Sequence, residues 1–147
     1  MAATHLLDPT HPRATQRLLA LFAVAALVSV VHYVDNVANY SDYPLSGTLP
    51  DPSAALIAVA WFAFTALGIA GVLEFRRRGP TPRAALLLGG YSGSGLIGIL
   101  HYSAAGATSM PWWRQLHIVA DIVCGLLIFA FALAIARSQT SASTVSR

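Results

Sequence analysis

Four long apolar stretches constrain this chain more than any other feature. They cover about residues 17–36, 53–75, 84–103 and 112–136. A helix of about twenty apolar residues, rising about 1.5 Å per residue, crosses a hydrocarbon core of about 30 Å. The chain is 56% hydrophobic and only 10% charged, whereas about 25% of the residues of a soluble domain are charged. The sequence therefore predicts an all-α integral membrane protein.

The connections between these stretches are short and leave no room for a soluble domain. Residues 37–52 are interrupted by prolines and a glycine, and Ser53 is suited to cap the second helix. Four spans joined in this way predict an up-down-up-down four-helix bundle over residues 17–137. Residues 1–16 contain prolines and are expected to form a flexible cytoplasmic lead. Residues 138–147, rich in Ser and Thr, are expected to form a disordered tail.

The arginines predict the orientation of the bundle. Eight of the nine lie on one side of the predicted spans, only Arg114 lies on the other side, and the chain has no lysine. Because basic residues concentrate in cytoplasmic loops, we expect a plasma (inner) membrane protein with both termini in the cytoplasm. The connections 37–52 and 104–112 would then face outward. The arginines form short clusters rather than one basic face, which argues against nucleic acid as a partner.

Ionisable residues near the outer ends of three spans mark a candidate site. In the first span His32 and Asp35 are three residues apart, so they share one helical face. In the fourth span His117 and Asp121 are four residues apart and also share a face. His101 lies near the outer end of the third span. Ionisable groups inside a membrane are costly and usually functional, so we expect these faces to meet in a pocket open to the outside.

Neighbouring polar and small residues extend these faces. Gly90, Ser94 and Gly98 recur at intervals of four in the third span, a pattern that lets another helix approach closely. Trp61, deep in the second span, is suited to the core or to a pocket wall. The residues expected to line the pocket are Ser29, Asn36, Trp61, Ser94, His101 and Arg114.

Three functions fit such a pocket. In the leading interpretation it binds a small lipid-like or amphipathic ligand and allows proton-transfer chemistry on it, because burial tunes the acidity of such groups. His32 and Asp35 would then be base and ligand contact, and His117 and Asp121 an oriented pair. In the second interpretation the protein is a metal-dependent membrane enzyme that holds a divalent transition metal. Its ligands would come from His32, Asp35, His101, His117 and Asp121.

The third interpretation is structural. The same polar groups would hydrogen-bond across helices and fix the register of a small accessory subunit of a membrane complex. The partners expected in all three cases are the lipid bilayer and, for the pocket, a small lipid-like ligand. Assembly as a homo-oligomer or within a larger membrane complex is compatible with the sequence.

The pattern resembles the four-helix EXPERA fold of emopamil-binding sterol isomerases and the sigma-2 receptor family. The resemblance rests on His32 and Asp35 near the outer end of the first span, Tyr43-Pro44 in the next connection, Trp61-Phe62 in the second span, and Tyr91 after a basic turn. It implies a pocket in the outer half of the membrane that binds sterol-like or cationic amphipathic molecules, with Asp35 as an acidic contact. Members of that family carry a pocket-facing carboxylate in the second span, which this chain lacks.

Overall fold

The computed structural model describes residues 7–45 and 50–145. In that part of the chain all regular structure is helical. The long helices are α2 (Ala14–Ala38), α3 (Ala54–Arg78), α4 (Pro82–Leu96) and α5 (Trp112–Val145). Short 3-10 helices lie between them: η1 (Tyr40–Asp42), η2 (Ile97–Ser103) and η3 (Ala107–Ser109). Four helical segments are long and apolar enough to cross a membrane, which confirms the predicted multi-pass helical membrane protein. Residues 1–6 of the expected lead and 146–147 of the expected tail lie outside the described residues.

Local sequence signals set several helix ends. The Ser53 side chain accepts a hydrogen bond of 3.2 Å from the Leu56 amide, which confirms the predicted cap of α3. At the other end of α3, Gly79 adopts φ +74°, a backbone conformation that glycine reaches without steric cost. The Thr81 side chain then caps α4 and is followed by Pro82 in the first turn. The turn between α3 and α4 is therefore encoded residue by residue.

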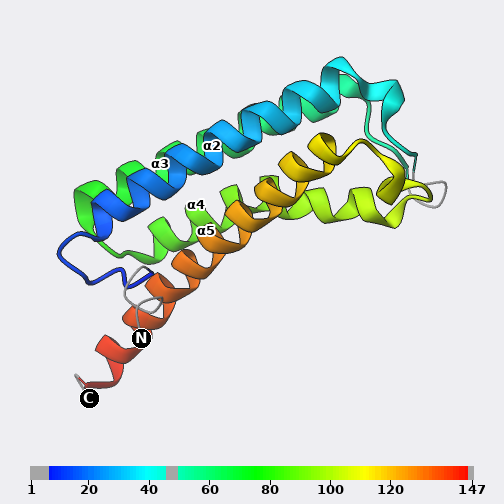
Figure 1. Ribbon diagram of the computed structural model, residues 1–147. Helices are drawn as coiled ribbons and strands as arrows, with labels where there is room; N and C mark the ends of the chain where they lie inside the picture. Colours follow the sequence, from blue (N-terminus) through cyan, green and yellow to red (C-terminus); the bar gives the residue numbers. More distant parts are fainter. Residues whose placement is uncertain (1–6, 46–49, 146–147) are drawn as a thin grey trace.

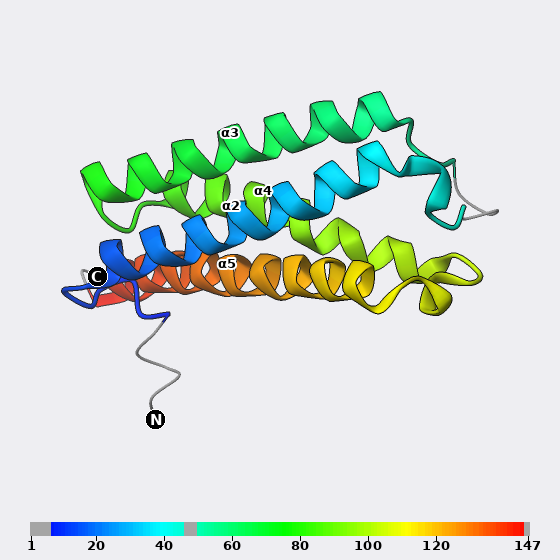
Figure 2. The same cartoon turned by 45° about the horizontal axis from the view of Figure 1, so that its top comes forward.

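The helices pack in a closed order. α2 contacts α3 and α5, and α4 contacts α3 and α5. Figures 1 and 2 show the start of α2, the end of α5 and the α3–α4 turn at one end of the bundle, and η1 and η2 at the opposite end. Large apolar side chains such as Val34, Phe62 and Leu86 are exposed along the flanks. Such a surface is suited to hydrocarbon rather than water.

Glycines bring α4 and α5 into backbone contact. A Cβ atom on Gly95 would overlap the backbone carbonyl of Asp121, and one on Gly125 would lie 2.9 Å from the carbonyl oxygen of Ser92. The predicted small-residue stripe is divided between two neighbours, because Gly90 faces Leu67 of α3 whereas Gly98 faces α5. The closest approach of α4 and α5 is therefore at Gly95, one position after Ser94 of the predicted stripe.

Two segments differ from the predicted spans. The third span leaves the α-helical form after Leu96 and continues as the seven-residue 3-10 helix η2, a long run for this geometry. The glycine-rich sequence before η2 weakens the α-helix there, and η2 carries His101. α5 continues past Arg137 into the stretch expected to be a tail. The Gln139 side chain donates a hydrogen bond of 2.6 Å to the Pro80 carbonyl and so ties this extension to the α3–α4 turn.

The interior changes character along the bundle. Towards the α3–α4 turn it is an apolar core built by residues such as Leu18, Phe75, Leu88 and Phe131. A smaller apolar cluster at the opposite end includes Tyr43 and Ile118. Buried polar side chains lie along the bundle between and beside these clusters. They include His32, Asp121 and Asn36, each with less than a tenth of its surface exposed.

Candidate functional site

A histidine and a carboxylate on different helices form the centre of the site. His32 of α2 donates from Nδ1 to Oδ2 of Asp121 on α5, at 2.8 Å. Each side chain is only 2% exposed. Gly98 lies against this histidine, because a Cβ atom there would be 3.5 Å from the His32 ring. The small residue in η2 thus leaves space for the imidazole.

His101 of η2 extends this pair. Its Nε2 atom lies 3.0 Å from Nδ2 of Asn36 and 3.4 Å from Nε2 of His32. An amide nitrogen can only donate, so Nε2 of His101 accepts and the ring proton of a neutral His101 lies on Nδ1. The described residues form no hydrogen bond with that Nδ1 atom. Nε2 is then the acceptor nitrogen of both neutral rings, so His32 and His101 are in contact but share a hydrogen bond only when one of them gains a second proton. Asp121, His32 and His101 form a polar row, called the relay below, and the Nδ1 donor of His101 at its end has no partner among the described residues.

The second carboxylate of the site, Asp35, is enclosed in a separate network. Its Oδ2 atom accepts from Nε of Arg114 at 2.9 Å and from the Tyr43 hydroxyl at 2.6 Å. Its Oδ1 atom accepts from the Asn39 amide at 2.7 Å. Arg114 also reaches Asp42 at 3.4 Å. This group, the Asp35 network, joins α2, η1, the following connection and α5.

Arg114 and Tyr43 reinforce each other in this network. The guanidinium of Arg114 lies 4.8 Å from the Tyr43 ring centre and 5.0 Å from that of Trp113, within the range of cation–π attraction. Burial and the hydrogen bond to Asp35 both raise the pKa of Tyr43, so its hydroxyl keeps its proton and donates. The Tyr43 ring also lies 5.0 Å from that of His101. Tyr43 therefore connects the Asp35 network with the relay.

His117 lies between the two groups without joining either. Its Nε2 atom is 3.3 Å from Oδ2 of Asp35, and its ring centre is 5.4 Å from that of His32. The contact with Asp35 lacks hydrogen-bond geometry, and both ring nitrogens are buried without a hydrogen-bond partner among the described residues. Buried polar atoms in this state usually bind water. Because neither His117 nitrogen has a hydrogen-bond partner among the described residues, the expected His117–Asp121 pair is not seen there, and Asp121 bonds His32 instead.

A cavity of about 440 Å³ opens beside the relay. Its volume falls in the range of small-molecule sites. His32, Asn36 and His101 form a polar part of its wall, and Tyr43 lies beside them. The apolar part of the wall comes from α3, the end of the third span and the connection after α2. It includes Leu56, Ile57, Ala60, Phe64, Ile97 and Leu100, together with Pro44, Leu45, Pro50 and Pro52. The cavity thus combines this polar corner with a largely apolar wall, and its lining also includes the polar residues Tyr40, Asp51 and Ser103.

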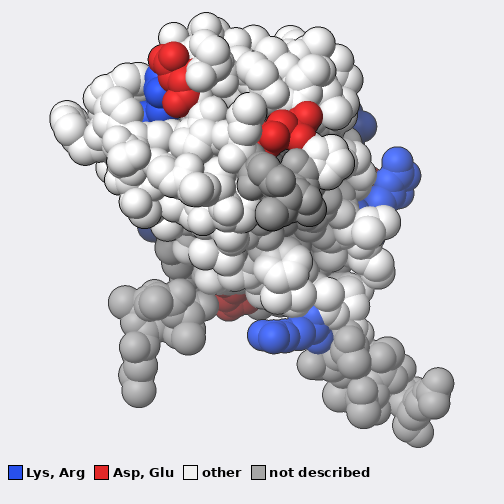
Figure 3. Space-filling model, turned by 90° about the vertical axis from the view of Figure 1, so that its right-hand side faces the viewer, with Lys and Arg blue, Asp and Glu red and all other residues white. Residues whose placement is uncertain are grey.

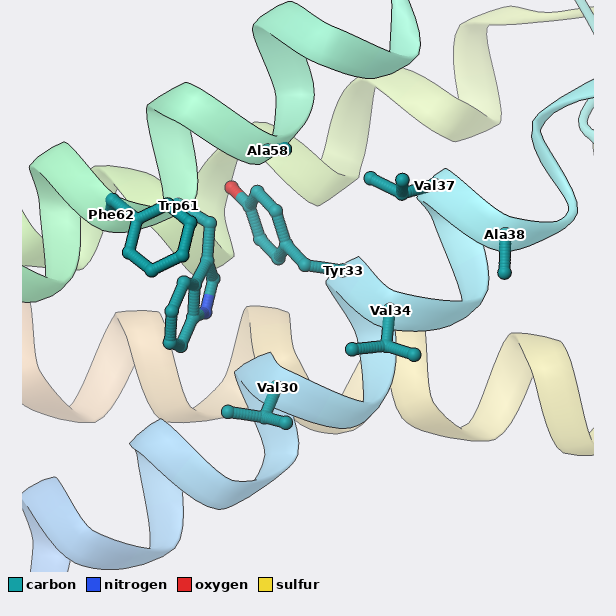
Figure 4. A pocket seen from close by; sticks show the side chains of 8 residues that line it. All are labelled: Val30, Tyr33, Val34, Val37, Ala38, Ala58, Trp61 and Phe62. Carbon is teal, nitrogen blue, oxygen red and sulfur yellow. The ribbon is translucent and has the colours of Figure 1, made fainter.

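A second, shallower groove of about 300 Å³ lies between α2 and α3 (Figure 4). Its wall is apolar except at the rims of the Tyr33 and Trp61 rings. The indole nitrogen of Trp61 donates to the Ser29 hydroxyl at 3.1 Å, and the Tyr33 hydroxyl donates to the Ser94 carbonyl at 3.1 Å. These polar atoms are thus occupied by contacts within the bundle.

The predicted site residues do not gather in one pocket. The relay contains His32, Asp121 and His101, and Asn36 is bonded to His101. The Asp35 network contains Asp35 and Arg114, and His117 lies beside it. Among the residues expected to line the pocket, Asn36 and His101 line the cavity. The other four do not, and they are Ser29, Trp61, Ser94 and Arg114. Trp61 lines the α2–α3 groove instead.

Several residues of the site were not predicted. Tyr43, Asn39 and Asp42 complete the Asp35 network, and Tyr33 fixes α2 to α4. The four-residue spacing of Asp35 and Asn39 was a usable signal, because such residues meet on a helix surface. Tyr43 carried no such signal, since only the fold of the connection after η1 brings it back to Asp35.

Possible metal ligands do not form a complete set as they stand. Among the described residues, no three His, Cys, Asp or Glu side chains are grouped closely enough to hold a metal ion. Comparison of the chain with family models, curated proteins and solved structures finds no match. The geometry of the cavity and its polar corner is therefore the basis for a functional assignment.

Proposed function

We propose that this membrane protein binds a small lipid-like or amphipathic molecule in the cavity beside the relay. The observation that carries the proposal is the position of His101: it lines the cavity, and its Nδ1 atom has no partner among the described residues. The apolar wall from α3 and η2 suits a hydrocarbon body. Binding sites of this kind fix the orientation of a ligand through a few polar groups.

The relay also supports proton transfer on such a ligand. Asp121 orients His32 and balances a proton on its ring, as a carboxylate does for a histidine base. His32 and His101 both line the cavity. Because Nδ1 of His32 donates to Asp121, Nε2 of the neutral His32 ring carries the lone pair that can take up a proton. In this proposal His101 contacts the ligand, whereas His32 and Asp121 form the base and its orienting partner. Asp35, first expected to contact the ligand, holds α2, α5 and the connection together.

The orientation proposed from the arginines agrees with the charges at the two ends. Arg76, Arg77, Arg78 and Arg83 are exposed around the α3–α4 turn. The opposite end, seen in Figure 3, shows mainly uncharged surface with small acidic patches, one of them beside a basic group, and Asp42 there is exposed. We propose that the helices alternate in direction across a plasma membrane, that both termini are cytoplasmic, and that the site lies in the outer half.

A relation to the EXPERA fold remains a proposal on the residues named above. Under that relation Asp35 would receive a cationic group. Here Arg114, Tyr43 and Asn39 already bind its carboxylate, so we place the ligand contact at His101 instead.

Two alanines of α3 supply the test. Ala60 lines the cavity, whereas Ala58 lines the α2–α3 groove, and both are partly buried. Protein released from membranes in mild detergent is extracted, and the bound small molecules are identified by mass spectrometry. We expect a molecule in stoichiometric amount with the parent and with Ala58→Phe, and its loss with Ala60→Phe. Equal amounts in both variants, or none in any sample, would contradict the proposal and favour the accessory-subunit interpretation.

One distance favours a metal-dependent enzyme as the second candidate. The Nε2 atoms of His32 and His101 are 3.4 Å apart, which is about the edge of a zinc tetrahedron with bonds of about 2.0–2.1 Å. Asp121 supports His32 from the other ring nitrogen, as carboxylates do behind metal-bound histidines. The other ligands would be water or substrate in the cavity. Elemental analysis of the parent beside His101→Phe tests this candidate: about one transition metal per chain, lost in the variant, supports it.

A further inference from the structure

We propose that the ligand of the cavity carries an uncharged oxygen group, a hydroxyl or a carbonyl, rather than an ammonium or a carboxylate. This inference rests on the proposed function and narrows its ligand to one chemical class. It follows from which charges of the site are accessible from the cavity and which are already paired.

The cationic group of the site is not available to a ligand. Arg114 is 4% exposed, bonds Asp35 and Asp42, and is absent from the cavity wall. The described residues that line the cavity include no arginine. A carboxylate placed among His101, Asn36 and the apolar wall would lose its hydration without gaining a charged partner, which is strongly unfavourable.

The anionic groups are equally unavailable. Asp35 does not line the cavity and is bonded by Arg114, Tyr43 and Asn39. Asp121 lies behind His32, which bonds it directly. Of the described residues that line the cavity, the one carboxylate is Asp51, which is exposed to solvent. Water and salt screen a charge in that position, so it offers little to hold an ammonium group at the polar corner.

The polar corner instead presents a neutral donor. Because Nε2 of His101 accepts from Asn36, Nδ1 of the neutral ring carries the proton and donates. The complement of such a donor is an oxygen lone pair. A hydroxyl or carbonyl oxygen supplies that lone pair and costs far less to remove from water than an ion.

Four probes with the same ten-carbon chain test the inference: decanol, decane, decanoate and decylamine. Their binding to the detergent-purified full chain at neutral pH is followed by native mass spectrometry. We expect decanol to bind about fivefold more tightly than decane, the factor for one neutral hydrogen bond. Decanoate and decylamine should bind at least tenfold more weakly than decanol. Tighter binding of either ion than of decanol would overturn the inference and leave the proposed function intact.

His101→Phe is the matched variant, because it keeps a ring and removes both nitrogens. Decanol and decane should bind this variant equally. A decanol preference that survives in His101→Phe would overturn the role of His101. Should this variant fail to fold, the order of the four probes on the parent still decides the ligand class. If no probe binds the parent more tightly than it binds Ala60→Phe, the cavity is not a binding site, and the proposed function fails as well.

Discussion

Two carboxylates on facing helices, Asp121 fully buried and Asp35 about 10% exposed, have opposite surroundings. Asp35 is held by a guanidinium, a phenol and an amide from three parts of the chain. Among the described residues, Asp121 bonds one side chain, that of His32, through a single oxygen. Both would cost several kcal/mol to bury as isolated ions. The first accepts hydrogen bonds from three side chains of the bundle, whereas the second orients a histidine that lines a cavity.

The difference separates structure from function within one cluster of polar residues. A carboxylate with several fixed partners specifies how helices and connections meet. A carboxylate that orients one histidine leaves the other side of that ring free for chemistry or binding. We therefore expect substitutions in the Asp35 network to act mainly on stability, and substitutions in the relay to act mainly on binding.

Loss of Arg114 should have the largest effect on stability. Arg114→Met leaves Asp35 in a mostly buried position without its cation, which typically costs about 3 kcal/mol. Thermal and denaturant unfolding in detergent measure this loss. Arg83→Met, at an exposed arginine, is the control and should be neutral. Paired with Asp35→Asn, the Arg114 substitution should cost less than it does alone, because the uncompensated charge is gone. Additive costs would show that the two side chains are not coupled.

A methyl group on Gly95 should have the second largest effect on stability. Gly95→Ala places a Cβ atom against the Asp121 backbone and forces α4 and α5 apart, at a cost of about 2 kcal/mol. Gly89→Ala in the same helix is the matched control, since a Cβ atom there meets nothing within 4 Å. That control should gain up to about 1 kcal/mol from better helix propensity. Equal unfolding midpoints for the two variants would refute the close packing of α4 on α5.

Asp121→Asn should change stability less than Arg114→Met or Gly95→Ala. The amide oxygen can still accept from Nδ1 of His32, so we expect a loss of about 1 kcal/mol. Decanol binding to Asp121→Asn then reports whether the negative charge of Asp121 matters to the relay. Decanol binding to Asp35→Asn, measured at the same protein concentration, is the comparison. A larger stability loss for Asp121→Asn than for Asp35→Asn would reverse the assignment of the two carboxylates.

Trp61→Phe should have the smallest effect on stability. The substitution keeps an aromatic ring and removes the hydrogen bond to Ser29, and bonds of this kind between membrane helices contribute about 0.6 kcal/mol. Because Trp61 lines the α2–α3 groove and not the cavity, decanol binding should be unchanged. Weaker decanol binding in this variant would indicate that the groove, rather than the cavity, holds the probe.

The sequence predicted the spans well because length and hydropathy decide them. It also placed His32, His101 and Asp121 on candidate inward faces, because a polar group in lipid is costly wherever it occurs. The partners could not be predicted. Helical spacing puts His117 and Asp121 on one face, but only the packing of α2 on α5 decides that Asp121 meets His32. The 3-10 geometry of η2 and the position of Tyr43 likewise depend on tertiary contacts.

Photolabelling with decanol that carries a mid-chain diazirine tests the central claim most directly. After illumination of the full chain in lipid nanodiscs, the labelled peptides are mapped by mass spectrometry, with excess decanol as competitor. The account predicts competed adducts on the cavity-lining residues of α3 and η2, and their loss in Ala60→Phe. These residues are Leu56, Ile57, Ala60, Phe64, Ile97, Leu100 and His101. Adducts confined to groove residues such as Val30, Val34 and Phe62, or adducts that excess decanol does not reduce, would contradict it.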